Sequence, residues 1–131
     1  MNIGQLADES GISAKMIRYY ESIQLIEIPK RSVAGYRIYN QQDLAILKFI
    51  KHAKDLGFSI DHIRNLLKLW NNETRQSSEV KLIANEHIQH LKNQMRLTQM
   101  MIDQLESAVE QCQDNEHAEC SILNTIQNGH E

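Results

Sequence analysis

The sequence has little that interrupts a helix, because its 131 residues include one proline and five glycines. Aromatic residues are also scarce, with four tyrosines, two phenylalanines and one tryptophan. Aromatic and β-branched residues favour strands, and they are sparse outside residues 26–39. These absences predict a mainly α protein: one ordinary domain, or a small domain that carries a long helix.

Long hydrophobic stretches are missing as well. No apolar run approaches the roughly 18 residues of a membrane span, and no signal-peptide pattern follows Met1. We therefore expect a cytoplasmic protein with no membrane partner, in a compartment where thiols stay reduced. The sequence also lacks a glycine-rich phosphate loop and any nucleophile or paired-carboxylate setting for its histidines, so it does not predict an enzyme.

Basic and acidic residues are unevenly distributed along the chain, although the net charge is only −3. Residues 15–54 contain eight basic and three acidic side chains, whereas residues 61–131 contain six basic and eleven acidic ones. Scattered solvated charge is one explanation. The other is a front half that binds a polyanion and a back half with a different task.

The first residues have the pattern of two short helices. Apolar residues at helical spacing predict the inner face of the first helix: Ile3, Leu6 and Ala7. Gly11 supplies a turn, and Ser13 can cap a second helix. The apolar side of that second helix is expected to contain Met16, Ile17 and Tyr20. Two short helices joined by a glycine-containing turn form a helix-turn-helix.

The opposite face of the second helix carries Lys15, Arg18 and Tyr19. In a DNA-binding helix-turn-helix this helix enters the major groove. Arginine can then read guanine, while lysine and tyrosine can contact phosphate. A generic helical hairpin with a solvated polar face explains this segment equally well.

A β-hairpin is the expectation for the next segment. Residues 26–29 and 36–39 are extended in character, and "KRSVAG" between them ends in Gly35. Three cations and one aromatic residue lie on this small projecting element: Lys30, Arg31, Arg37 and Tyr36. Such a wing can hold backbone phosphate beside a recognition helix.

Two amphipathic helices follow, separated by Gly57, and Ser59 or Asp61 can cap the second. The stripe of the first consists of Leu44, Leu47, Ile50 and Ala53. The stripe of the second consists of Ile63, Leu66, Leu67 and Trp70.

Three motifs follow one another along this part of the sequence: "MIRYYESIQLI", "KRSVAGYRIY" and "LKFIKHAKDLGFSIDHIRNLL". Together they resemble the winged helix-turn-helix domain of the MerR family of transcription activators. The resemblance implies a DNA-binding domain over residues 1–70. It places Lys15, Arg18 and Tyr19 in the major groove, assigns phosphate contacts to Arg31, Tyr36 and Arg37, and puts Lys54 in a second wing.

The back half lacks proline and glycine from residue 78 to residue 128. Residues alternately three and four apart form a heptad-type seam: Ile88, Leu91, Met95, Thr98, Ile102, Leu105, Val109 and Cys112. A second copy of the chain can cover this seam, and MerR relatives use an antiparallel coiled coil for this purpose. We expect residues 71–111 to be a linker and dimerisation helix. A twofold dimer suits a near-palindromic operator in double-stranded promoter DNA.

The only two cysteines bracket "CQDNEHAEC", residues 112–120. A disulfide is disfavoured in a reducing compartment. A structural zinc site normally needs four ligands. Cys112 and Cys120 supply two, His117 can supply a third, and Glu116 or Glu119 can supply a weak fourth. Two thiolates suffice for a soft monovalent ion such as Cu(I). The spacing by itself leaves these possibilities open.

Among these three possibilities for the cysteines, the resemblance favours the site for a soft monovalent ion. Copper-efflux (CueR-like) members of the MerR family carry a loop with this cysteine spacing directly after the dimerisation helix, and its cysteines bind Cu(I), Ag(I) or Au(I). The match implies that Cys112 and Cys120 are the ligands, within a metal-binding loop and short C-terminal helix over residues 112–131. Sensors of divalent ions have a further cysteine where this chain has Ser77, which becomes a buried neighbour of the metal.

The implied function is activation by distortion of promoter DNA, which affects RNA polymerase indirectly. Two alternatives remain: a divalent, zinc-type sensor that uses His117 as an extra ligand, and a copper-buffering protein without gene control.

Overall fold

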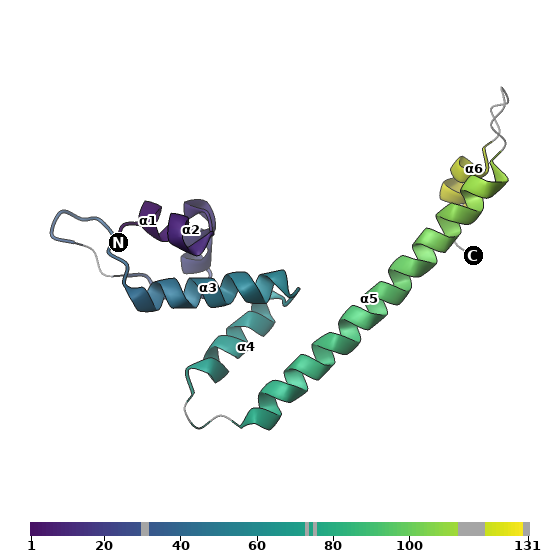
Figure 1. Cartoon of the computed structure of the whole chain (residues 1–131). Helices are drawn as coiled ribbons and strands as arrows, with labels where there is room; N and C mark the ends of the chain where they lie inside the picture. The colour runs from purple at the N-terminus through teal and green to yellow at the C-terminus, as the bar shows by residue number, and fades with distance from the viewer. Residues whose placement is uncertain (30–31, 73, 75, 113–119, 130–131) are drawn as a thin grey trace. The chain divides into compact units, whose positions relative to one another are not determined.

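The computed structural model describes residues 1–29, 32–72, 74, 76–112 and 120–129. The chain divides into two compact units, Met1–Val80 and Lys81–Glu131, and the division falls in the first turn of its longest helix. The described residues form six helices (Figure 1): α1 (Ile3–Ser10), α2 (Ala14–Ser22), α3 (Gln41–Asp55), α4 (Ile60–Trp70), α5 (Ser77–Gln111) and α6 (Ser121–Asn128). The expectation of a mainly α protein is confirmed.

The predicted helix-turn-helix forms at the start of the chain. Asn2 and Gln5 close a capping box at the beginning of α1, and Gly11 ends that helix in the left-handed conformation with φ 75°. The Ser13 hydroxyl oxygen accepts a hydrogen bond from the Met16 backbone N–H at 3.2 Å and caps α2. Side-chain caps of this kind satisfy N–H groups that have no partner inside the helix. Local sequence signals therefore set both helices and the turn between them.

One hydrophobic core holds α1 to α4 together, with α1 packed on α2 and α3, and α3 packed on α4. Its largest fully buried side chains are Leu6, Ile17, Leu47, Ile50 and Ile63. Burying a side chain of this size stabilises a protein by about 1.5–3 kcal/mol. The predicted stripe of α3 is buried throughout, and Ser59 caps α4.

The buried face of α2 differs from the expectation. Ile17 and Tyr20 are buried as predicted, but Met16 is 38% exposed. The third inward position belongs to Glu21, which is 3% exposed. Ile17, Tyr20 and Glu21 are spaced three and four residues apart, so they share one helical face. A buried carboxylate therefore stands on the inner side of α2.

Neither residues 26–29 nor residues 36–39 form a strand in the described part of the chain, where Arg37 makes an isolated β-bridge, so the predicted β-hairpin is not seen there. The backbone N–H of Tyr39 instead donates to the Met1 carbonyl at 2.8 Å, and the Met1 ammonium donates to the Tyr39 carbonyl at 2.8 Å. The expected turn does exist, since the Gly35 N–H donates to the Ser32 carbonyl at 2.9 Å with φ 87° at Gly35. This loop, residues 32–37, is called the wing loop below.

Arg64 of α4 anchors the end of α2. Its guanidinium donates to the carbonyl oxygens of Ile23 and Gln24, each at 3.0 Å. Gln24 has φ 59°, a left-handed conformation that side chains other than glycine rarely adopt. A cation that binds the last carbonyls of a helix also opposes its negative end. Arg64 thus stabilises the strained exit from α2.

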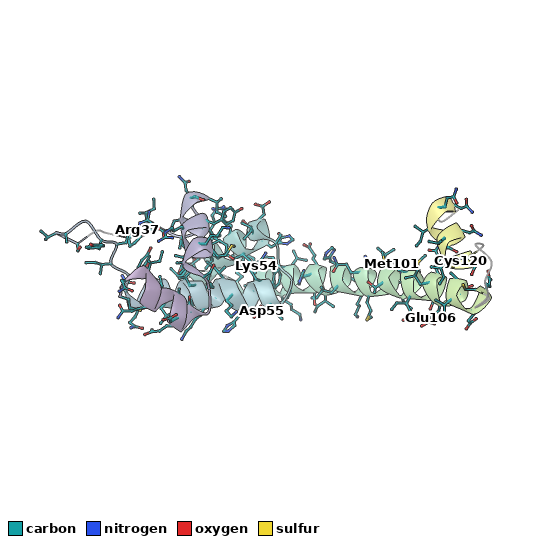
Figure 2. All side chains as sticks on the ribbon, turned by 90° about the horizontal axis from the view of Figure 1, so that it is seen from above. Arg37, Lys54, Asp55, Met101, Glu106 and Cys120 are labelled. Carbon is teal, nitrogen blue, oxygen red and sulfur yellow. The ribbon has the colours of Figure 1, made fainter. Side chains whose placement is uncertain are left out.

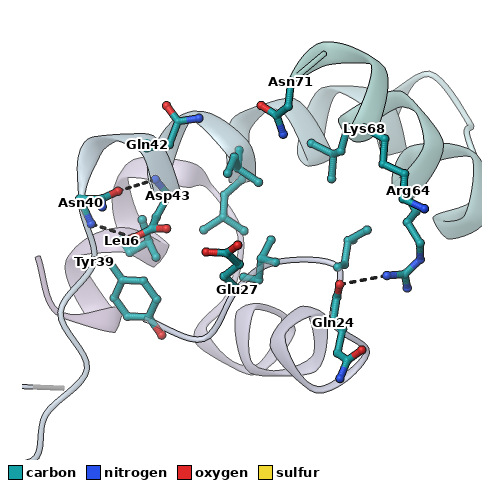
Figure 3. A pocket seen from close by; sticks show the side chains of 15 residues that line it. Leu6, Gln24, Glu27, Tyr39, Asn40, Gln42, Asp43, Arg64, Lys68 and Asn71 are labelled. Atoms are coloured by element: carbon teal, nitrogen blue, oxygen red, sulfur yellow. Dashed lines mark hydrogen bonds between the residues drawn. The ribbon is translucent and has the colours of Figure 1, made fainter. Parts of the chain in front are cut away.

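Arg64 also lines a cavity of about 560 Å³ within the N-terminal unit, between α3, α4 and the segment after α2 (Figure 3). Its apolar floor includes Leu6 and Leu47, and its rim carries both acidic and basic side chains, including Glu27 and Lys68. The Arg64–Gln24 hydrogen bond stands on one side of this cavity (Figure 3).

In the C-terminal unit, α6 folds back on the end of α5 (Figure 1). The Ser121 hydroxyl donates to the Ala108 carbonyl, and Ala108 is buried there. The apolar residues of the predicted seam remain largely exposed in the single chain: Ile88, Leu91, Met95, Ile102, Leu105 and Val109. No helix in the described part of the chain is both long and apolar enough to cross a membrane.

Replacing Arg64 with leucine is expected to lower the free energy of unfolding of the N-terminal unit by about 1–2 kcal/mol, because two charge-assisted hydrogen bonds are lost at a partly exposed site. Urea unfolding followed by fluorescence measures this. The fluorescence of the single tryptophan, Trp70, reports on this unit because its ring stacks on that of Phe49, with the ring centroids 4.6 Å apart. Lys68→Leu, at an exposed position of the same helix, is the matched control. Equal unfolding midpoints for the two variants contradict the anchoring role of Arg64.

Candidate functional site

The outer face of α2 presents the three side chains that the sequence singled out. Lys15, Arg18 and Tyr19 are all exposed, because the opposite side of the helix packs into the core. Tyr19 lies beside Tyr20 with ring centroids 6.0 Å apart, so its ring rests against a buried neighbour. The fold therefore directs two cations and one hydroxyl away from the core on a single helix.

The wing loop lies next to this face. Arg18 of α2 and Tyr36 and Arg37 of the wing loop line one hollow of about 280 Å³, together with Gly35 and the start of α1. Tyr36 is 73% exposed, whereas the Arg37 side chain is 30% exposed. Figure 2 shows Arg37 beside the loop that projects from the helices of the N-terminal unit. Three predicted site residues, from two elements, thus converge on one concave surface with two positive charges.

A buried carboxylate holds Arg37 at this surface. The Arg37 Nη1 donates to Glu21 Oε1 at 3.0 Å, and the Tyr39 hydroxyl donates to the same oxygen at 2.9 Å. Burial raises the pKa of the Tyr39 hydroxyl, and the hydrogen bond to Glu21 raises it further, so Tyr39 remains a proton donor. Sequence reasoning missed Glu21. Its helical spacing from Ile17 and Tyr20 is the signal that pointed inward.

Lys54 and Arg31 are the remaining residues with a predicted phosphate contact. Lys54 is exposed in the last turn of α3 and is not among the residues that line the hollow. Arg31 lies outside the described residues. Its predicted phosphate contact therefore stays a prediction.

The two cysteines meet at the junction of α5 and α6. Cys112 directly follows α5, Cys120 is the N-cap residue of α6, and their sulfur atoms are 3.3 Å apart. The backbone N–H of Leu123 lowers the pKa of the Cys120 thiol, as do the Cys112 thiol and the N–H of Ile122. Donors at a helix N-terminus favour the thiolate in this way. Two soft donors with access to a thiolate form are thus held together.

Other candidate ligands do not join this pair in the part of the chain that the structure describes. No group of three or more His, Cys, Asp or Glu side chains is close enough there to hold a metal ion. His117 lies outside the described residues, as does the whole segment 113–119. Ser77 is exposed at the first position of α5, at the opposite end of that helix from Cys112. Ser77 is not buried in the single chain, and its predicted place as a buried neighbour of the metal stays a prediction.

Known proteins resemble this chain over almost its whole length. Residues 1–70 match the family model "MerR HTH family regulatory protein", and residues 44–108 match the model "MerR, DNA binding". Heavy metal-dependent transcription regulator 2 of Rhizobium meliloti (strain 1021) is 42% identical over 129 residues, which cover 98% of this chain and 88% of the relative. The HTH-type transcriptional regulator CueR of Salmonella typhi is 33% identical over 126 residues, covering 96% and 91% respectively.

The fold is shared with solved structures. The transcription regulator PbrR691 from Ralstonia metallidurans CH34, crystallised in complex with lead(II), superposes with a TM-score of 0.83 at 28% identity and covers 96% of this chain and 98% of that one. The absence of enzyme signatures in the sequence agrees with these relatives, which are transcription regulators. The chain belongs to the MerR family of helix-turn-helix transcription regulators and is not an enzyme.

Proposed function

We propose that this regulator binds promoter DNA as a homodimer and senses a soft monovalent metal ion, Cu(I) above all and also Ag(I) or Au(I), through Cys112 and Cys120. The observation that carries the proposal is the 3.3 Å separation of the two sulfur atoms at the junction of α5 and α6. Thiolates are the ligands that Cu(I) prefers, and low coordination satisfies it.

The charge balance at the thiol pair favours a monovalent ion. Two thiolates and one ion of charge +1 leave a net charge of −1, which buried or half-buried sites must offset. The backbone N–H groups of Ile122 and Leu123 point toward the Cys120 sulfur and supply that compensation. A divalent ion attracts further donors, and the described residues bring no His, Cys, Asp or Glu side chain to form a group of three with the pair. When bound, the ion supplies two metal–sulfur bonds that tie the end of α5 to the start of α6.

The relatives support a metal response in general. One is named as heavy metal-dependent and another as CueR, while the structurally similar PbrR691 binds lead(II). The lead-bound relative is the reason to keep a divalent sensor that uses His117 as the second candidate. A copper-buffering protein without gene control is set aside, because the family consists of transcription regulators.

The remaining parts have proposed tasks in this scheme. Residues 1–70 bind DNA through Lys15, Arg18 and Tyr19 on α2, with Arg31, Tyr36, Arg37 and Lys54 on phosphates. Residues 71–111 pair with a second chain in an antiparallel coiled coil that covers the exposed seam of α5. Residues 112–131 hold the ion. A second chain also brings its own α2 to the second half of a near-palindromic operator.

Activation then requires coupling between the thiol pair and the DNA. Bending or untwisting a promoter of this size costs about 1–6 kcal/mol by elastic estimates. The ion shifts the dimer toward the distorting shape only if it binds that shape more tightly than the other. Distorted spacer DNA lets RNA polymerase engage both promoter elements, so the polymerase is an indirect partner.

Alanine at Arg18 or Arg37 is expected to weaken operator binding with and without metal. If Arg18 reads a base, its loss should cost about 1–3 kcal/mol and relax specificity at one position. Loss of a phosphate contact, expected for Arg37, should weaken binding evenly across DNA sequences and reduce the salt dependence by about one charge. Fluorescence anisotropy at several salt concentrations measures both quantities. Lys68→Ala removes one charge from α4 outside the hollow that Arg18 and Arg37 line and is the control. Unchanged binding by both arginine variants contradicts the proposed DNA surface.

Serine at Cys112 or Cys120 is expected to abolish metal-dependent transcription and to leave operator affinity without metal within about twofold, because the thiols are proposed to hold the ion and to make no contact with DNA. Run-off transcription on the cognate promoter and anisotropy on the same DNA separate the two effects. A matched loss of DNA affinity in both variants shows instead that the thiol pair is structural.

The unmodified protein is expected to respond to Cu(I) and Ag(I) but not to Zn(II), and His117→Ala to change this little. Ser77→Cys should add a third thiolate from the second chain and admit Zn(II) or Hg(II), since the serine hydroxyl is a hard, neutral donor. Ser78→Cys, one position further along α5, is the matched control. Sulfur-edge and metal-edge X-ray absorption gives the ligands. A Zn(II) response that disappears in His117→Ala favours the divalent sensor.

A further inference from the structure

Glu21 occupies a position where a carboxylate is unfavourable. It stands on the inner face of α2, 3% exposed, beside the buried Ile17 and Tyr20. Removing a charge from water has a large desolvation penalty, and the C-terminal turn of a helix repels negative charge. An apolar side chain at this position avoids both penalties. A specific partner must therefore account for the carboxylate.

Its partners, Arg37 and Tyr39, come from the end of the wing loop and from the segment directly after it. Arg37 Nη1 and the Tyr39 hydroxyl both donate to Oε1, at 3.0 and 2.9 Å, across separations of 16 and 18 residues. Oε2 is buried without a hydrogen-bond partner. The carboxylate is thus only half satisfied, and both of its bonds tie the recognition helix to the wing loop. Buried polar atoms that lack partners are rare in proteins and call for an explanation.

The Arg37 side chain contacts both the buried Glu21 carboxylate and the hollow. It carries five N–H donors in a rigid planar fork, of which Nη1 binds Glu21. The same side chain lines the hollow that it shares with Arg18, Tyr36 and Gly35. One end of the fork is therefore held from inside the protein, while further donors are left for an oxygen in the hollow. Among the described residues, no carboxylate pairs with the exposed side chain of Arg18 in this way.

We propose that Glu21 is a positioning residue for DNA binding: it locks the guanidinium of Arg37 in the orientation that presents its remaining donors to a backbone phosphate in the hollow. The inference rests on the proposed contact between Arg37 and DNA. Two effects of the carboxylate oppose each other. Its charge repels phosphate, whereas its hydrogen bond removes the conformational freedom that Arg37 otherwise loses on binding. Glu21 favours DNA binding because orientation outweighs repulsion.

The Glu21→Gln variant tests whether Glu21 raises or lowers the affinity for operator DNA. The amide keeps the shape and can still accept from Tyr39, but it lacks the charge that holds the guanidinium. Positioning predicts operator affinity about tenfold lower at moderate salt, with a salt dependence reduced by about one charge. Repulsion by itself predicts the reverse, tighter binding with the salt dependence unchanged or steeper. Tighter or equal binding overturns the proposal.

A double-mutant cycle separates positioning from loss of fold. In an Arg37→Ala background, Glu21→Gln should cause no further loss of DNA affinity, because the side chain to be positioned is gone. An additional tenfold loss there overturns the proposal and indicates general destabilisation of α2. Thermal unfolding of each variant fixes a temperature at which all of them are folded for the binding assay.

Arg37→Lys provides a test with Glu21 intact. A lysine has one point charge, so it cannot bind the carboxylate and present a separate edge to phosphate. Positioning predicts that Arg37→Lys loses as much affinity as Arg37→Ala; retention of most of the affinity overturns it. If Arg37→Ala itself binds DNA normally, the proposed contact of Arg37 fails. If only Glu21→Gln binds normally, that contact stands and the positioning role alone fails.

Discussion

Packing of the inner face of α2 against the core is the interaction on which the rest of the N-terminal unit depends. Ile17 and Tyr20 bury this face, and Arg64 holds the strained exit of the helix by its last carbonyl groups. The opposite face is then free to carry Lys15, Arg18 and Tyr19 into solvent. A recognition helix must be rigid, because every degree of freedom lost on binding lowers affinity. The core supplies this rigidity, and the Glu21–Arg37 pair extends it to the wing loop.

The thiol pair lies at two helix ends, and the backbone groups of one of them affect the chemistry of its thiol. Cys120 begins α6, where backbone N–H groups lack helical partners and stabilise negative charge on sulfur. Cys112 ends α5, so any ion between the two sulfurs joins the end of the long helix to the short one. This placement suits the proposed sensing role, because α5 is also the helix whose exposed seam is proposed to pair with a second chain.

Several site residues were predictable from local patterns, whereas their grouping was not. The exposed side chains of α2 follow from helical spacing, and the two cysteines stand out in any sequence with no others. The hollow that gathers Arg18, Tyr36 and Arg37 depends on how the wing loop lies against α2. The β-hairpin expected over residues 26–39 is not seen among the described residues, where backbone groups of Tyr39 pair with Met1, 38 residues away. Propensity within residues 26–39 contains no information about that competitor.

The sequence by itself determined the helices, their caps at Ser13 and Ser59, the turn at Gly11, and the three ordered motifs that resemble the family. These features depend on residues within about four positions of each other, the range over which helical side chains and caps interact. Only the tertiary structure decided that Glu21 replaces Met16 on the buried face, that Arg37 binds that carboxylate, and that the two sulfurs meet. Each of these depends on contacts between segments 8 to 18 residues apart, whose geometry follows from how the segments pack.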